Sequence, residues 1–132
     1  MKEKELMTKN PQEWLSQADY DFQTAEYMFS GGRYTYAVFM AHLATEKALK
    51  GIYQKKFNAL PPKTHSLIYF LSETKTHPPE NIGKFLVTLD QASVATRYPE
   101  DLAKLQSVYT QPVVKEILSR TKEALEWVKK TF

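Results

Sequence analysis

Apolar residues recur at helical spacing in several parts of the chain. In the first part, residues 11–30, they stand four, four, three and four positions apart, which is the period of one helix face: Trp14, Ala18, Phe22, Ala25 and Phe29. The Asn10-Pro11 pair is typical of a helix start, because Asn caps the first turn and Pro suits its first position. Gly31-Gly32 ends the helix, and so short a connection predicts that the next helix runs antiparallel to it.

The second predicted helix, residues 34–57, is apolar around much of its circumference, which is typical of the central helix of a bundle. Its alanines form a narrow stripe against which another helix can pack closely: Ala37, Ala41, Ala44 and Ala48. The opposite side mixes aromatic with charged or polar residues: Phe39, His42, Glu46, Lys50, Tyr53 and Phe57. Aromatic residues among charges on a core helix indicate that this side faces a partner or forms a site.

Prolines separate the next two helices. Pro61-Pro62 breaks the chain, and Thr64 is expected to cap a third helix over residues 65–76. The segment His77-Pro78-Pro79 ends this helix and begins a fourth, which is expected over residues 80–95.

The last helix is expected over residues 112–130, while residues 100–111 fit either one helical turn or a loop. No segment alternates between apolar and polar residues as a strand does. The pattern therefore predicts an all-α fold, an up-and-down antiparallel bundle of four long helices with a fifth, short one as a variant. Residues 1–132 are expected to form a single domain, with residues 1–9 as a loose N-terminal extension.

The composition excludes several kinds of site. The chain has 132 residues and no Cys, which rules out a disulfide scaffold, a Cys-ligated zinc site and a thiol nucleophile. No Asp, Glu or His grouping has a metal-ligand spacing, and no Gly-rich phosphate loop is present, so we expect neither a metal nor a cofactor. No run approaches the ~18 apolar residues of a membrane span, and we expect a cytoplasmic protein.

Positive charge is concentrated in one segment. The formal net charge is +3, but residues 33–63 carry six basic side chains and one acidic one. Such a segment can attract a polyanion or a complementary protein, or it can simply form solvated helix faces. Glu46 and Lys50 are spaced as a helix-stabilising ion pair, and the alternative is that Lys47 and Lys50 bind a phosphate.

The tripeptide Arg97-Tyr98-Pro99 is the strongest candidate for binding chemistry. An arginine offers a planar pair of donors to a phosphate, and a neighbouring tyrosine can stack on a base. The alternative is that Arg97 ties its loop to Asp21 or Glu46, with Tyr98 packed against the protein. Asp21 itself is expected at a helix surface or in an interhelical ion pair.

The three histidines have different settings. His42 precedes Glu46 by one helical turn, so this carboxylate could orient its ring, or His42 is a hydrogen-bonded residue of the interior. His65 follows a predicted helix cap and either packs against the prolines before it or lines a polar cleft. His77 is expected to be a loop residue.

Short motifs follow one another in a fixed order along nearly the whole chain: Trp14, Ala18-x-x-Asp21-Phe22-x-x-Ala25, Tyr36-Ala37-x-Phe39, Glu46-Lys47-Ala48-Leu49-Lys50, Thr64-His65-x-Leu67 and Arg97-Tyr98-Pro99. Over residues 11–130 their order and spacing resemble the HEPN domain, named for higher eukaryotes and prokaryotes nucleotide-binding. The resemblance implies a bundle of four or five helices, commonly a homodimer. In prokaryotes it implies a minimal nucleotidyltransferase protein as partner, the pair acting as toxin and antitoxin.

Many HEPN toxins are ribonucleases that use an Arg and a His separated by about four to six residues, and this chain departs from that motif. No His follows Arg97 or Arg120, and eight residues separate Arg33 from His42. A metal-independent ribonuclease needs a group that activates the 2′-hydroxyl and a cation that stabilises the phosphorane. Only the cation is supplied at the family's position, by Arg97.

The resemblance therefore implies a nucleotide- or RNA-binding or interaction component of a nucleotidyltransferase-linked, toxin–antitoxin type system. The expected ligand-binding residues are Lys47, Lys50, His65, Arg97 and Tyr98. The first alternative is a ribonuclease that combines Arg97 with a histidine brought from elsewhere in the fold, His42 or His65. The second alternative is a structural dimer with no ligand.

Overall fold

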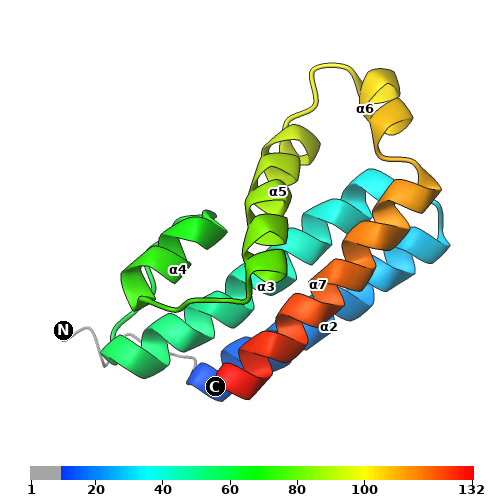
Figure 1. Cartoon of the computed structure of the whole chain (residues 1–132). Helices are drawn as coiled ribbons and strands as arrows, with labels where there is room; N and C mark the ends of the chain where they lie inside the picture. The colour runs from blue at the N-terminus through cyan, green and yellow to red at the C-terminus, as the bar shows by residue number, and fades with distance from the viewer. Residues whose placement is uncertain (1–9) are drawn as a thin grey trace.

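The computed structural model describes residues 10–132, and this part of the chain contains helices and no strands (Figure 1). The helices are α2 (Pro11–Ser30), α3 (Tyr34–Phe57), α4 (Leu67–Thr74), α5 (Glu80–Arg97), α6 (Leu102–Val108) and α7 (Gln111–Thr131). The all-α prediction is confirmed: α2, α3, α5 and α7 are the four long helices. The structure has two short helices beside them, α4 and α6, whereas the sequence predicted at most one short helix. The predicted loose extension, residues 1–9, lies outside the described residues.

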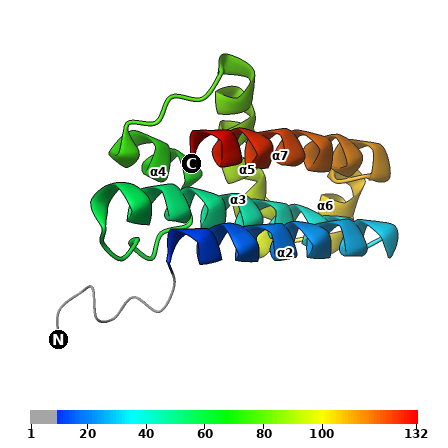
Figure 2. The same ribbon diagram turned by 90° about the horizontal axis from the view of Figure 1, so that it is seen from below.

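The central position of α3 is confirmed. Helices α2, α3 and α7 run side by side, and α5 crosses α3 at a steep angle (Figures 1 and 2). Within the described residues α3 contacts each of the other five helices. Its alanine stripe is at most 1 % exposed, which lets the neighbouring helix backbones approach closely. No described helix combines the length and the apolar character needed to cross a bilayer.

The ends of α2 follow the local signals of the sequence. Asn10 Oδ1 accepts a hydrogen bond from the Glu13 N–H at 2.8 Å, with Pro11 at the first helical position. Gly31 ends the helix, and Gly32 takes a φ of +75°, a conformation that glycine adopts without strain. The predicted antiparallel pair of α2 and α3 is the result.

The prediction for the third helix is wrong at both ends. The helix spans Leu67–Thr74, and its cap is Ser66, whose Oγ accepts from the Tyr69 N–H at 3.1 Å. Thr64 instead accepts from the Ser66 N–H, one step before the helix. At the other end Lys75 takes a left-handed conformation, with φ 53°, and stops the helix before Thr76.

The ambiguous segment between α5 and α7 forms a short helix, α6. Asp101 caps it by accepting from the Lys104 N–H at 3.1 Å. None of its residues is buried, although Leu102 and Val108 are apolar. Helix α6 therefore lies on the surface, over the end of the bundle where α7 begins (Figure 1).

Candidate functional site

A cavity of about 430 Å³ brings together several of the predicted site residues. The loop before α4, the middle of α3 and the second half of α5 line it, with His42, Thr64, His65, Ser66, Asp90, Ser93, Val94, Arg97 and Tyr98. Three of the five predicted ligand residues, His65, Arg97 and Tyr98, thus share one cavity, together with His42. Residues that lie far apart in the chain meet here because α5 crosses α3.

Glu46 holds His65 at the edge of this cavity. Its carboxylate is buried on α3, with Oε1 2.8 Å from His65 Nδ1 and Oε2 2.9 Å from Lys50 Nζ. With Nδ1–H donating to Glu46, the neutral imidazole keeps Nε2 as an acceptor. The His65 side chain is 61 % exposed, so this nitrogen can reach a ligand. His65 thus bonds Glu46 on α3, a contact that neither of its two expected settings included, and it also lines the cavity.

His42 is a hydrogen-bonded residue of the interior, which is one of its two expected settings. Its ring is 1 % exposed, and its Nε2 lies 2.9 Å from Asp90 Oδ1 on α5 rather than against Glu46. Asp90 also accepts from the backbone N–H groups of Leu67 and Ile68, at 3.0 and 3.2 Å. Asp90 therefore joins three elements: it orients His42 on α3 and ties the first turn of α4 to α5.

The contacts of Asp90 shift its acidity. Burial raises the pKa of the Asp90 carboxyl, but the hydrogen bonds from His42 and from the Leu67 and Ile68 N–H groups outweigh it. The net result is a pKa below the ordinary value for an aspartate. The carboxylate is thus stabilised in its charged form by the fold.

Asp90→Asn should lower the free energy of unfolding by about 2 kcal/mol at neutral pH, because an uncharged amide accepts these hydrogen bonds less strongly. A carboxyl with a lowered folded-state pKa stabilises the fold above its unfolded pKa of about 4, and this stabilisation is lost as pH falls through the folded value. Urea denaturation should therefore show the wild type and the variant converging below about pH 4. Glu80→Gln, which breaks an exposed ion pair with Lys84, is the control with a small effect. A difference at Asp90 that persists unchanged in acid would contradict this interpretation.

Arg97 presents an immobilised cation to the cavity. Its guanidinium lies over the Phe39 ring, 4.5 Å from the centroid. Nε and Nη2 are buried and have no hydrogen-bond partner among the described residues. Stacking on an aromatic ring fixes the plane of the guanidinium, and the two nitrogens retain donors for an anion.

The alternative assignment for Arg97 and Tyr98 is wrong. Asp21 pairs with Lys47 at 2.8 Å, and Glu46 is occupied by the two partners described above, so neither carboxylate holds Arg97. Tyr98 is 78 % exposed and does not pack into the protein. The tripeptide thus combines a guanidinium that is stacked on Phe39 with an exposed tyrosine ring.

The comparisons with known proteins agree with the motif resemblance. The model of the HEPN domain matches residues 11–131. The chain belongs to the HEPN domain family. ST0689, an archaeal HEPN homologue of known crystal structure, is similar over 94 % of this chain and 98 % of its own, with 30 % identity and a TM-score of 0.75. TT1696 from Thermus thermophilus shares the fold, with 24 % identity, a TM-score of 0.79 and coverage of 92 % and 98 %. No curated protein matches the chain.

The two predicted lysines of this HEPN domain occupy different surroundings. Lys50 joins the cavity residues only through Glu46, and its ammonium also lies 5.8 and 5.9 Å from the ring centroids of Trp14 and Phe70. Lys47 pairs with Asp21 on α2, and this interhelical ion pair is one of the two settings expected for Asp21. Lys47 does not line the cavity. Both charges are therefore neutralised by carboxylates, which reduces the positive field expected from residues 33–63.

Asp90 is the residue of this site that sequence reasoning missed. It is the one acidic residue of α5 beyond the first turn, where Glu80 stands. A single carboxylate next to the apolar Leu89 in the middle of a mixed helix was the only available signal, and it is a weak one. His77, expected in a loop, lies in the connection between α4 and α5 and does not line the cavity.

Among the described residues, no group of three or more His, Asp or Glu side chains could hold a metal ion.

Proposed function

We propose that this HEPN-domain protein binds a phosphate group of a nucleotide or an RNA in the cavity shared by His65 and Arg97. The observation that carries the proposal is the Arg97 guanidinium, which is fixed on Phe39 and has two buried nitrogens without a partner in the described part of the chain. A guanidinium held in one plane with free N–H donors matches the geometry of phosphate oxygens. His65 adds a second polar contact, and the exposed ring of Tyr98 can stack on a base.

The size and charge of the cavity fit this ligand class. A volume of about 430 Å³ lies within the roughly 300–1,000 Å³ of small-ligand sites, which suits one nucleotide unit. Among the described residues Asp90 is the only carboxylate in the lining, and it already accepts from His42, Leu67 and Ile68, so its oxygens are engaged within the protein. A longer RNA would continue from the cavity across the exposed ring of Tyr98.

A metal-independent ribonuclease is the second candidate function, because Arg97, His65 and His42 line one cavity although the family's spaced pair is absent. In that reaction His65 Nε2 would accept the 2′-hydroxyl proton while Arg97 stabilised the phosphorane. The leaving oxygen must also gain a proton. His42, the other histidine, is 1 % exposed and bonded to Asp90, so it is poorly placed to supply one. Binding therefore ranks above cleavage.

A labelled single-stranded RNA distinguishes the two functions. We expect the wild type to raise the fluorescence anisotropy of the RNA and to leave it intact on a gel, and His65→Ala to weaken binding by roughly three- to tenfold, the loss of one hydrogen bond. His77→Ala removes a histidine outside the cavity and should bind as the wild type does. Cleavage that His65→Ala abolishes and His77→Ala retains would establish the ribonuclease instead. No binding even at low salt would refute both and favour a structural dimer with no ligand.

We also propose a homodimer and a minimal nucleotidyltransferase protein as partner, in a toxin–antitoxin type system. Apolar side chains lie exposed beside the cavity and on α6 and are suited to such contacts: Val94, Tyr98, Leu102 and Val108. Co-purification with a nucleotidyltransferase encoded by a neighbouring gene would support the pairing. A molar mass of one chain in light scattering would count against the dimer.

A further inference from the structure

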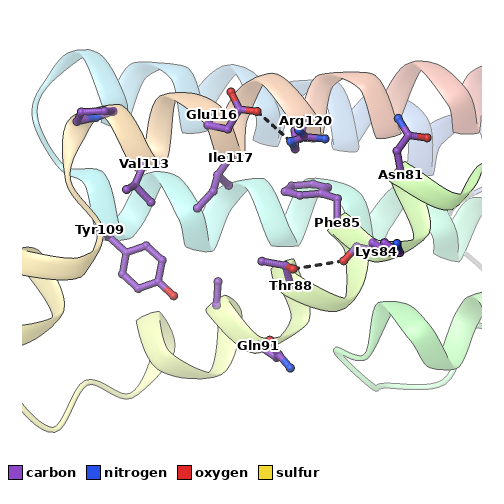
Figure 3. A pocket seen from close by; sticks show the side chains of 12 residues that line it. Asn81, Lys84, Phe85, Thr88, Gln91, Tyr109, Val113, Glu116, Ile117 and Arg120 are labelled. Carbon is purple, nitrogen blue, oxygen red and sulfur yellow. Dashed lines mark hydrogen bonds and ion pairs between the residues drawn. The ribbon is translucent and has the colours of Figure 1, made fainter.

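A groove of about 860 Å³ lies between α5 and α7, apart from the cavity that His65 and Arg97 share (Figure 3). The two have no lining residue in common. Helix α5 supplies one wall and the first half of α7 the other, with Tyr109 in the connection that leads into α7. The volume lies within the range of small-ligand sites, and neither the sequence motifs nor the proposed phosphate site accounts for this groove.

Most of the apolar lining of this groove is recessed. Phe85 is buried, Tyr109 and Ile117 are half-buried, and Val113 is 42 % exposed. Tyr109 and Val113 lie toward one end of the groove, where α7 begins (Figure 3). A protein–protein interface of standard size needs about 800 Å² from each partner. A recessed apolar lining between two helices suits a thin alkyl chain better than the broad surface of another protein.

Two cations lie toward the other end of the groove. Lys84 of α5 and Arg120 of α7 both line it there, with Asn81 beside them (Figure 3). Their carboxylate partners are Glu80 and Glu116, each at 2.9 Å and each one turn away on the same helix. All four charged side chains are exposed, and exposed ion pairs of this kind are weak. An incoming anion can therefore replace either carboxylate at little cost.

Arg120 keeps donors for such an anion. Its contact with Glu116 uses Nε, and neither Nη group donates to another described residue. Among the described residues Glu116 is the only carboxylate in the lining, so Lys84 and Arg120 give the groove a net positive charge. The Thr88 hydroxyl donates to the Lys84 carbonyl oxygen and is already engaged (Figure 3). Charge complementarity thus favours a ligand that is anionic at this end and apolar at the other.

We propose that the groove between α5 and α7 binds a free medium-chain fatty acid, with the carboxylate at Lys84 and Arg120 and the alkyl chain running toward Val113. Arg120 and Val113 stand seven residues apart, about 10 Å along the axis of α7, a distance that such a chain spans. Burial of the chain supplies the hydrophobic driving force, and the two cations fix its direction. This inference does not depend on the phosphate site proposed above.

The test is calorimetric titration of sodium decanoate, below its micelle concentration, into the intact protein. Two other ligands test the two ends of the groove. Hexanoate lacks four methylenes, and decyltrimethylammonium has the same chain with the opposite charge, so each should bind at least about tenfold more weakly than decanoate.

Charge variants test the cationic end. Lys84→Gln combined with Arg120→Gln should weaken decanoate binding about tenfold, because both contacts to the carboxylate are lost. Glu116→Gln should strengthen it by up to about fivefold, because a competing carboxylate is removed from the lining. The matched control is Lys130→Gln, which removes a charge near the C-terminal end of α7, outside the groove, and should leave the affinity within about twofold.

Val113→Asp tests the apolar end. Val113 stands in the first turn of α7, where an acidic side chain favours the helix, so this variant should keep the circular dichroism of the wild type. A carboxylate against the alkyl chain should nevertheless weaken decanoate binding at least about tenfold.

Three outcomes would overturn this proposal. The first is no binding of decanoate below its micelle concentration. The second is equal binding of decanoate and decyltrimethylammonium, which would indicate an apolar surface without a site for the carboxylate. The third is displacement of labelled RNA by decanoate together with an unchanged affinity in Val113→Asp, which would place the fatty acid at Arg97 and leave the proposed function standing.

Discussion

Glu46→Ala should lower the free energy of unfolding by about 3–5 kcal/mol, the usual cost of removing one partner from a buried ion pair. The carboxylate is 3 % exposed and serves Lys50 and His65 at once. Without it the Lys50 ammonium, only 13 % exposed, loses its counter-charge and is left beside the rings of Trp14 and Phe70. Equilibrium denaturation by urea measures the loss, which is a large part of the roughly 5–15 kcal/mol that stabilises a typical domain.

Two further variants separate the ion pair from simple loss of side-chain volume. Glu46→Ala combined with Lys50→Met removes both charges and should recover much of the stability, because an apolar replacement of a buried pair is often close to neutral. Glu116→Ala breaks the exposed pair with Arg120 and should cost under about 0.5 kcal/mol. If Glu46→Ala were no more damaging than Glu116→Ala, Glu46 would not organise the site as we describe.

Arg97→Ala should weaken RNA binding by about ten- to a hundredfold, since hydrogen bonds to a charged group contribute about 1.5–3 kcal/mol. Arg97→Lys should restore only part of the affinity. An ammonium keeps the charge, but it has neither the planar pair of donors nor the flat face that packs on Phe39. Anisotropy titration with the same labelled RNA measures both variants.

Full rescue of RNA affinity by Arg97→Lys would show that charge alone matters and that stacking on Phe39 does not. The free energy of unfolding of each variant is the control for structural damage.

Local signals predicted the fold well where local contacts decide the structure. Asn10, Pro11 and the two glycines after Ser30 set the ends of α2 through neighbours in the chain. The start of α4 has a local cap as well, but it is Ser66, two residues after the predicted Thr64. Asp90, more than twenty residues away, accepts from the N–H groups of Leu67 and Ile68 in the same turn, and no local pattern could predict that contact.

The predicted site was incomplete for a similar reason. The motif order pointed to His65 and Arg97, and the crossing of α5 over α3 brings these residues to one cavity. The pairing of His42 with Asp90 and of Lys47 with Asp21 depends on how helices pack, since each pair joins two different helices. Charge counted along the sequence could not show that both lysines are neutralised within the fold.

The most direct test of the central claim is an RNA titration at low and at high salt with three proteins: wild type, Arg97→Ala and Lys130→Ala. Lys130 has the same charge as Arg97 but lies near the C-terminal end of α7, outside the cavity that His65 and Arg97 share. We expect Arg97→Ala to lose affinity at both salt concentrations and its salt slope to fall by about 0.7, the contribution of one contact to a single strand. Lys130→Ala should match the wild type. An equal loss in both variants would contradict a phosphate site at Arg97 and leave only nonspecific attraction.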